Sequence, residues 1–395
     1  LKNKIDVKLI SIERSQDIYY QKQVEIGKPM RNFHNWIKTN IIYPYCFSRN
    51  IRNEKKKYDI LDIGMGRGGD IMKFFTSRVK SYVGIDPDYH GIYSSSTDGA
   101  LSRLKTFKRK FPAFPPMTFI VADAGKPFTK DSQIAAVGKV SNENLKGLDR
   151  FFGSDKNKVN FKYDIITSMF ALHYLFKDET TWNHFTDNIN KTLKEGGYFL
   201  CALFDGELVH SKFKDKKIES YYFDESESKK FFEIKKLYNG NKLNKFGLKL
   251  DVHISSFMNP NVFQTEFLVS KHFLINQLKE KCNLDLVETE LFENIYNNHR
   301  SFFNVIPEVE SNKDTKSYFM KVKEIYDLTD NLNKASFEMS RLNRYYIFHK
   351  KVTNIDNLNQ NNNSTKAKID KINLDINEEN NFKSKTNPKT KTKPK

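Results

Sequence analysis

Short apolar runs recur along residues 58–350 and alternate with segments whose apolar residues follow helical spacing. Apolar runs bounded by glycine or charged residues are typical of strands. Strands that alternate with helices predict a mostly parallel sheet covered by helices on both faces. We therefore expect an α/β fold that includes the strands YDILDIG (58–64), SYVGID (81–86), MTFIVAD (117–123), YDIITSMF (163–170) and GGYFLCALF (196–204).

An amphipathic helix is expected before the first strand, over residues 28–42 (KPMRNFHNWIKTNII). Pro29 suits a first helical turn. The pair Tyr43-Pro44 is expected to end the helix, because proline disfavours helical backbone at the residue before it. The apolar positions that follow helical spacing are Phe33, Trp36, Ile37 and Ile41.

Composition divides the chain into three parts. Residues 1–25 are mixed and charged and form an N-terminal extension, and residues 26–351 form the expected domain. Residues 130–160 are polar and dotted with glycine, so we expect a surface insertion before the fourth strand. Residues 352–395 are rich in Asn and Lys and too polar to bury a core, so we expect a disordered tail.

The charge of the chain indicates a polyanionic partner. There are 66 Lys and Arg against 48 Asp and Glu, a formal net charge of +18. A strongly basic body attracts nucleic acid, although a genome that favours Lys, Asn and Ile would give a similar composition. No run of about 18 uncharged apolar residues predicts a membrane span. Cys46, Cys201 and Cys282 lie far apart, which argues against a zinc site or a disulfide framework.

A glycine-rich turn follows the first strand, in ILDIGMGRGGD (60–70), and leads into a helix. Glycines allow a tight turn and let a ligand approach the backbone at a helix N-terminus. The spacing also satisfies GxGxxG, and Asp86 ends the next strand where a ribose-binding acid belongs. Both a dinucleotide and S-adenosylmethionine therefore have to be considered.

Four acids around this turn favour the cationic ligand. Carboxylates around the turn would repel the pyrophosphate of a dinucleotide but would attract the ammonium and sulfonium groups of S-adenosylmethionine. If the acids only capped helices, nothing would explain why three of them end successive strands. The pattern predicts a class I methyltransferase sheet, and the four acids are Asp62, Asp70, Asp86 and Asp123.

Seven ordered motifs give the chain a resemblance to the mRNA cap guanine-N7 methyltransferases, in particular to the methyltransferase domain of multifunctional capping enzymes of large DNA viruses. The resemblance spans about residues 25–350. It implies a class I S-adenosylmethionine-dependent methyltransferase, Rossmann-like, with a mostly parallel seven-stranded sheet and an accessory cap-pocket element over about 204–267. The motifs are RNFHNWIK (31–38), LDIGMGRGGD (61–70), GIDPD (84–88), ADA (122–124), FALHYLF (170–176), LKEGGYFL (193–200) and EFLV (266–269).

The resemblance also implies a cofactor site for S-adenosylmethionine, without a metal. Lys38 would approach the methionine carboxylate, Asp86 would accept both ribose hydroxyls and Asp123 would meet the adenine amino group. These roles suit a cation and acceptor-only carboxylates. The remaining implied cofactor residues are Asp62, Gly64, Gly66, Asp70 and Ser168.

For the cap guanine, the resemblance implies an aromatic wall of Phe170, His173 and Tyr174. His173 would donate to guanine O6, and Glu266 would accept from the N1 and N2 hydrogens. Adenine would leave both groups unpaired, so the pair would select guanine. Taken alone, His173 would be a buried histidine at a strand end, and Glu266 would be a surface strand residue.

Two further positions complete the implied cap site. Tyr345 matches a tyrosine that helps to close the pocket, and Tyr346 stands directly beside it. His34 occupies a position near the cap where many family members have asparagine. We therefore rank His34 below Lys38.

No residue is expected to act as a general acid or base, because guanine N7 already carries a lone pair. The protein would hold the nucleophile, the methyl group and the leaving sulfur in line. Two alternatives stay open: a non-catalytic RNA-binding subunit that kept the fold, and a class I methyltransferase for another RNA. A DNA amino-methyltransferase would need an Asn/Asp-Pro-Pro-aromatic motif, which TSMFALHY lacks. Guanylyl transfer would need Lys-x-Asp-Gly, and Leu203 replaces that lysine before Asp205-Gly206.

The expected partner is the capped 5′ end of mRNA, with a stimulatory subunit or fused triphosphatase and guanylyltransferase domains as further candidates and no membrane. The charged N-terminal sequence lacks the form of a signal peptide. We expect a cytoplasmic replication site for a viral protein and the nucleus for a cellular one.

Overall fold

The computed structural model describes residues 26–48, 57–94, 99–153, 161–213 and 216–352. The chain divides into two units, Leu1–Lys350 and Lys351–Lys395. The expected N-terminal extension lies outside the described residues, and so does the expected tail apart from its first residue. None of the described helices is both long and apolar enough to cross a membrane.

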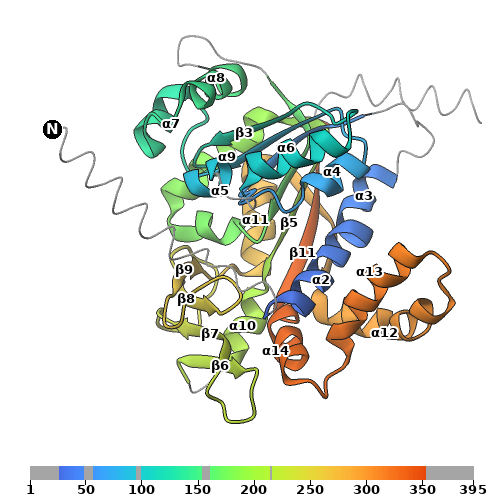
Figure 1. Cartoon of the computed structure of the whole chain (residues 1–395). Coiled ribbons are helices and arrows are strands. Elements are labelled where there is room, and N and C mark those ends of the chain that lie inside the picture. Colours follow the sequence, from blue (N-terminus) through green and yellow to red (C-terminus); the bar gives the residue numbers. More distant parts are fainter. Residues whose placement is uncertain (1–25, 49–56, 95–98, 154–160, 214–215, 353–395) are drawn as a thin grey trace, which may run out of the picture. The chain divides into compact units, whose positions relative to one another are not determined.

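A seven-stranded sheet forms the centre of the first unit (Figure 1), with the strand order β10-β11-β5-β4-β1-β2-β3. The strands β1 to β5 run parallel to one another, and β11 is antiparallel to both β5 and β10. This arrangement confirms the expected mostly parallel sheet. The strands are β1 Asp59–Ile63, β2 Ser81–Asp86, β3 Met117–Val121, β4 Tyr163–Met169, β5 Leu193–Phe204, β10 Leu284–Leu291 and β11 Asn343–Lys350.

Two hydrophobic clusters cover the two faces of this sheet. Alternate residues of a strand point to opposite faces, so Ile60 of β1 joins one cluster and Leu61 joins the other. The first cluster receives α2 (Lys28–Ile37), α4 (Ile71–Thr76), α5 (Tyr89–Tyr93), α6 (Ala100–Lys110), α12 (Phe292–Val309), α13 (Lys313–Lys323) and α14 (Asn331–Ser340). The second receives α8 (Asn142–Phe151), α9 (Glu179–Thr192) and α11 (Lys271–Cys282). Cys201 and Cys282 are buried free thiols in the second cluster.

The expected helix end at Tyr43-Pro44 is wrong. The helix α2 continues through a π-helical segment, Lys38–Ile42, into α3 (Tyr43–Ser48). The Tyr43 amide donates to the Lys38 carbonyl, five residues back, and this wider turn accommodates a proline that lacks an amide hydrogen. Pro44 therefore widens the helix instead of ending it, and Lys38 lies at the widened turn.

Residues 130–153, the described part of the segment 130–160, are not the surface insertion that we expected. They contain α7 (Lys130–Val137) and α8, and the described residues Leu148 and Phe151 belong to the core. Asn144 is buried and uses its side-chain amide to bond both the amide and the carbonyl of Val121 in β3, at 2.7 and 3.2 Å. The polar residues that suggested a surface loop thus satisfy buried backbone groups.

The segment 204–267 forms a second, antiparallel sheet, as expected for an accessory element. It contains α10 (Gly206–Lys212), β6 (Ile218–Tyr222), β7 (Lys230–Lys236), β8 (Lys249–Ile254) and β9 (Gln264–Phe267), with the strand order β6-β7-β8-β9. Its core includes Phe232 and Val252 and is shared with Met339 of α14. The guanidinium of Arg344 lies 2.5 Å from the carboxylate of Asp205 and ties α10 to β11. The last strand, β9, carries Glu266.

Candidate active site

The glycine-rich turn is tied to the end of β2 by backbone hydrogen bonds. Gly64 and Gly66 have positive φ angles, +74° and +53°, which side-chain-bearing residues rarely adopt. The Gly66 amide donates to Asp86 Oδ2 and the Asp88 amide to Asp86 Oδ1, each at 2.8 Å. Burial raises the pKa of Asp86 to about 6 although both bonds favour the carboxylate. Each oxygen keeps a lone pair for another donor.

Asp70, at the end of the turn, is the centre of a buried charge cluster. Lys38 Nζ lies 2.7 Å and Lys73 Nζ 2.7 Å from its Oδ1, and the Tyr43 hydroxyl donates to Oδ2 at 2.5 Å. Burial alone would raise the pKa of Asp70, but the two ammonium groups hold it well below its ordinary value. The π-helical segment therefore places Lys38 beside the glycine turn, and its expected contact with the methionine carboxylate stays a prediction.

Asp62 lies within the sheet behind this cluster. It accepts hydrogen bonds from the Tyr82 hydroxyl and from Thr167 Oγ1, both at 2.7 Å. Burial, and next the charge of Asp70, raise the pKa of Asp62 to about 7. Both oxygens of Asp62 therefore have protein donors, which makes it a support for the turn. Its expected contact with the methionine end of a ligand stays a prediction.

Asp123 and Ser168 complete the expected cofactor residues. The Asp123 carboxylate accepts from the Gly125 amide at 2.8 Å, and its own amide donates to Gln133 Oε1 at 2.8 Å. Ser168 is fully buried in β4, and its hydroxyl has no hydrogen-bond partner among the described residues. Because buried polar atoms are usually paired, this hydroxyl is available to a ligand or to water.

Phe170 has a left-handed backbone, with φ +59°, and its amide donates to the Ala202 carbonyl at 2.7 Å. Its ring stacks on His34, with centroids 5.0 Å apart and planes 17° apart. The Ser340 hydroxyl donates to the Ser336 carbonyl, so His34 Nε2, 3.0 Å away, must be the donor to Ser340 Oγ. Burial, and next Lys38, lower the pKa of His34 to about 3, and its ring is neutral.

His173 and Glu266 meet where the two sheets adjoin. His173 lies in a 3-10 helix, Leu172–Lys177, which follows β4, and its ring centroid is 4.2 Å from that of Tyr174. Its Nε2 is 3.6 Å from Glu266 Oε2, and neither ring nitrogen has a hydrogen-bond partner in the described structure. Burial lowers the pKa of His173 to about 3 and raises that of Glu266 to about 8. Near pH 7 both are mostly uncharged, so the short distance is not an ion pair.

Tyr345 lies on the Phe170 side of the sheet, whereas Tyr346 faces the other cluster. The Tyr345 hydroxyl donates to Glu288 Oε1 of β10 at 2.6 Å. A contact with a bound guanine would require this hydroxyl to leave Glu288. The structure thus resolves the register in favour of Tyr345, and its role in closing the pocket stays a prediction.

Sequence reasoning missed most of the side chains that hold these residues in place. Lys73 was detectable, since it stands three residues after Asp70 on a helix. Tyr43, Tyr82 and Ser340 carry no local signal, because each reaches its partner from a distant segment. The described residues contain no group of three or more His, Cys, Asp and Glu side chains placed to hold a metal ion.

The chain is similar in sequence to known proteins. Residues 11–317 match the family model of the mRNA (guanine-N(7))-methyltransferase domain. A probable mRNA-capping enzyme of Acanthamoeba polyphaga mimivirus is 40% identical over 349 residues, which cover 85% of this chain and 28% of that protein. An mRNA cap guanine-N(7) methyltransferase of Caenorhabditis elegans is 28% identical over 290 residues, or 71% of this chain and 66% of that protein.

Among solved structures, an S-adenosylmethionine-dependent methyltransferase from Clostridium acetobutylicum aligns with a TM-score of 0.41 and 11% identity, covering 81% of this chain and 97% of that one. The chain spans little more than a quarter of the mimivirus protein, 28% of its length.

Proposed function

The chain belongs to the mRNA (guanine-N7)-methyltransferase family, and on that premise we propose that it transfers a methyl group from S-adenosylmethionine to N7 of the guanine that caps mRNA. The observation that carries the proposal is the contact between His173 and Glu266. A neutral imidazole and a carboxyl group, 3.6 Å apart and buried, can pair with neighbouring positions on one edge of a base.

The chemistry of this pair suits guanine. His173 can donate from one ring nitrogen to O6, and Glu266 can accept from the N1 and N2 hydrogens once it is ionised. The unpartnered nitrogens of His173 support this reading, because a buried donor without a partner is costly until a ligand satisfies it. Phe170 and Tyr174 would contact the face of the same base.

The residues at the glycine turn fit S-adenosylmethionine, which supplies a methyl group on a sulfonium. Asp86 keeps one lone pair on each carboxylate oxygen, which suits two neighbouring ribose hydroxyls. The buried hydroxyl of Ser168 lacks a partner in the described structure. Lys38 provides a positive charge for the carboxylate of S-adenosylmethionine, and Asp70 provides a negative charge for its ammonium group. Asp123 lies just after β3, where its carboxylate would accept a hydrogen bond from the adenine amino group.

The proposed mechanism needs no general base and no metal, because N7 attacks with its own lone pair. His173 and Glu266 would fix the rotation of the guanine in its plane, and the aromatic rings would fix the plane itself. Correct placement of two reactants can supply several kcal/mol of the barrier. Positive charge moves towards the guanine during transfer, so nearby carboxylates would also stabilise the transition state.

The test is methyl transfer from labelled S-adenosylmethionine to RNA that begins with GpppN, compared with RNA that begins with ApppN or a triphosphate. We expect transfer to the guanine cap alone and its loss in Glu266→Ala. Glu233→Ala is the matched control, because Glu233 is equally buried in the accessory sheet but pairs with Lys230 and Lys235. Equal transfer to ApppN, or full activity of Glu266→Ala, would overturn the proposal.

A non-catalytic RNA-binding subunit is the second candidate, and the intact glycine turn and Asp86 speak against it. It would transfer no methyl group to any cap in this assay and would still bind RNA in a separate binding measurement. As partners we propose the capped mRNA end and further capping activities, in a fused domain or a separate subunit. This is supported by the mimivirus relative, which is named a capping enzyme and is much longer than this chain. We propose a cytoplasmic replication site if the protein is viral and the nucleus if it is cellular.

A further inference from the structure

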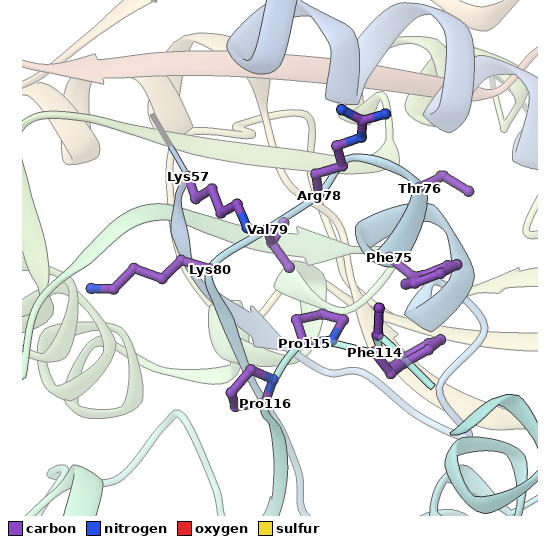
Figure 2. A pocket seen from close by; sticks show the side chains of 10 residues that line it. Lys57, Phe75, Thr76, Arg78, Val79, Lys80, Phe114, Pro115 and Pro116 are labelled. Carbon is purple, nitrogen blue, oxygen red and sulfur yellow. The ribbon is translucent and has the colours of Figure 1, made fainter. Parts of the chain in front are cut away.

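A cavity of about 590 Å³ (Figure 2) lies at the amino ends of parallel strands of the main sheet, whereas the candidate active site lies at their carboxyl ends. Its residues come directly before three parallel strands: Lys57 precedes β1, Lys80 precedes β2 and Pro116 precedes β3. The amino ends of neighbouring parallel strands lie together, and the glycine turn and Asp86 lie at the other ends of these strands, the carboxyl ends. The cavity is lined by Lys57, Phe75, Thr76, Arg78, Val79, Lys80, Ala113, Phe114, Pro115 and Pro116.

The charged side chains that line this cavity are all cationic. Lys57 and Arg78 have no carboxylate partner within 4 Å among the described residues. Lys80 Nζ lies 3.1 Å from Asp59 Oδ2, but its side chain is 65% exposed, so the pair is well solvated. The last turn of α6 adds the exposed residues Lys108, Arg109 and Lys110 just before the loop that forms one wall. The cavity therefore attracts anions.

Figure 2 shows the rings of Phe75, Phe114, Pro115 and Pro116 grouped on one side of the cavity. Phe75 and Phe114 stack with ring centroids 4.4 Å apart and planes 8° apart, and both are only partly buried. The exposed ring of Phe111 lies 5.1 Å from Phe75. Cations beside accessible rings are the combination that binds single-stranded nucleic acid, because the cations contact phosphates and the rings stack on bases.

Arg78 gives a second, independent observation. The Arg78 amide donates to the Phe75 carbonyl and the Val79 amide to the Phe74 carbonyl, so a Schellman motif ends α4. Arg78 occupies the left-handed position of this motif, with φ +53°, where glycine is the usual residue. Local backbone geometry thus disfavours an arginine here. The strained backbone is therefore the reason to test this side chain.

We propose that this cavity binds single-stranded RNA downstream of the cap, with phosphates contacted by Lys57, Arg78 and Lys80 and a base packed against the partly exposed edge of the Phe114 ring, whose faces stack on Phe75 and Phe107. The identity of the RNA as a capped transcript rests on the proposed function. The contacts are to phosphates and to the face of a base, so binding is independent of sequence.

The position of the cavity sets a minimum length for the RNA. A five-residue strand such as β1 spans roughly 17 Å, so a cap dinucleotide at one edge of the sheet cannot also occupy the other. Only a longer transcript reaches both. A cap dinucleotide and a long RNA therefore separate the contribution of the cavity from that of the active site.

The test is binding of a labelled, uncapped RNA of about 20 nucleotides, longer than one single-strand site, over a series of salt concentrations. The variants are Arg78→Gly, which removes the cation and relieves the backbone, and Arg78→Gly combined with Lys57→Ala. Lys316→Ala, at an exposed lysine of α13, is the control for the charge lost in Arg78→Gly, and adding Lys313→Ala matches the charge lost in the double variant. We expect the double variant to bind about tenfold more weakly and the slope of log K against log salt to flatten by about 1.4, for two lost phosphate contacts.

Methylation of GpppG should be unchanged in the same variants, and the unfolding midpoint of Arg78→Gly should not fall. The inference is overturned if the double variant binds RNA as Lys316→Ala does, or if methylation of GpppG falls in parallel. Displacement of the RNA by free GTP at similar concentration would also overturn it, since the cavity would then take a mononucleotide. Because binding is measured without methyl transfer, a failure of the proposed function leaves this result readable.

Cross-linking locates the contact directly. RNA that carries 5-bromouridine at single positions should form adducts within residues 111–116 or 75–80, and Phe114→Leu should reduce them. Adducts restricted to other segments would overturn the assignment.

Discussion

His173 Nε2 lies 3.6 Å from Glu266 Oε2, and burial leaves both side chains mostly uncharged near pH 7. The two residues come from different sheets, since His173 follows β4 and Glu266 lies in β9. The accessory sheet therefore provides the acceptor and the main sheet provides the donor. Guanine recognition in the proposed reaction depends on how the two sheets pack.

Cap binding should release a proton from Glu266. With a pKa of about 8 the carboxyl group is mostly protonated at pH 7, and it must ionise to accept two N–H groups. We expect about 0.9 proton to be released per cap dinucleotide bound at pH 7, and cap affinity to rise with pH up to about 8. Calorimetry in buffers of different ionisation enthalpy measures the release. Glu266→Gln should release none, and a wild-type value near zero would contradict the prediction.

S-adenosylmethionine affinity should depend on the protonation of Asp86. Its pKa of about 6 means that the carboxylate is lost as pH falls through 6, and a protonated group accepts ribose hydroxyls poorly. We expect affinity to fall by about tenfold per pH unit below 6. Titration with S-adenosylhomocysteine from pH 5 to 8 tests this. Asp86→Asn should bind weakly with a flat pH profile, and an unchanged profile in that variant would assign the titration to another group.

Asp70→Asn should destabilise the protein strongly, because Lys38 and Lys73 would remain buried without a counter-charge. Breaking a buried ion pair from one side costs about 3–5 kcal/mol in unfolding free energy. The lowered pKa of Asp70 has a related consequence: its contribution is complete above the ordinary aspartate pKa and is lost as pH falls below it. Urea unfolding at pH 7 measures the first effect. Adding Lys38→Met should restore part of the loss, and a single variant as stable as wild type would contradict the prediction.

Gly64→Ala should clash with the segment that carries His173. A Cβ on Gly64 would lie 2.3 Å from Ala171 Cβ, at a φ of +74°. We expect a loss of about 2–5 kcal/mol in unfolding free energy, from overpacking and backbone strain together. The double variant Gly64→Ala with Ala171→Gly removes the clash and should recover the overpacking part. Gly69→Ala is the control, since its Cβ would meet nothing within 4 Å. No recovery in the double variant would show that backbone strain alone accounts for the loss.

The sequence predicted those features that depend on local pattern. Three acids were expected to end successive strands, and the structure places Asp62 in β1, Asp86 at the end of β2 and Asp123 two residues after β3. The position of the Lys38 side chain was harder to predict from the sequence. Its delivery to Asp70 depends on a π-helical turn, and only tertiary contacts such as the Tyr43–Asp70 hydrogen bond reveal that turn.

Partners that are distant in sequence explain the other gaps. Asn144 looks like a loop residue until β3 is placed beside it, and the hydrogen bond from Tyr345 to Glu288 has no signal in the local sequence. A buried amide or hydroxyl takes its meaning from the group that it satisfies. A single sequence does not show that group when it lies on another element.

The place of β11 makes assembly of the sheet dependent on the end of the folded unit. It lies between β5 and β10 and is the last strand of the described chain to leave the ribosome. Until it is made, β5 and β10 each present an unpaired edge to other chains. A truncation before Asn343 would therefore remove an inner strand and leave β5 and β10 as unpaired edge strands, and we expect such a product to aggregate.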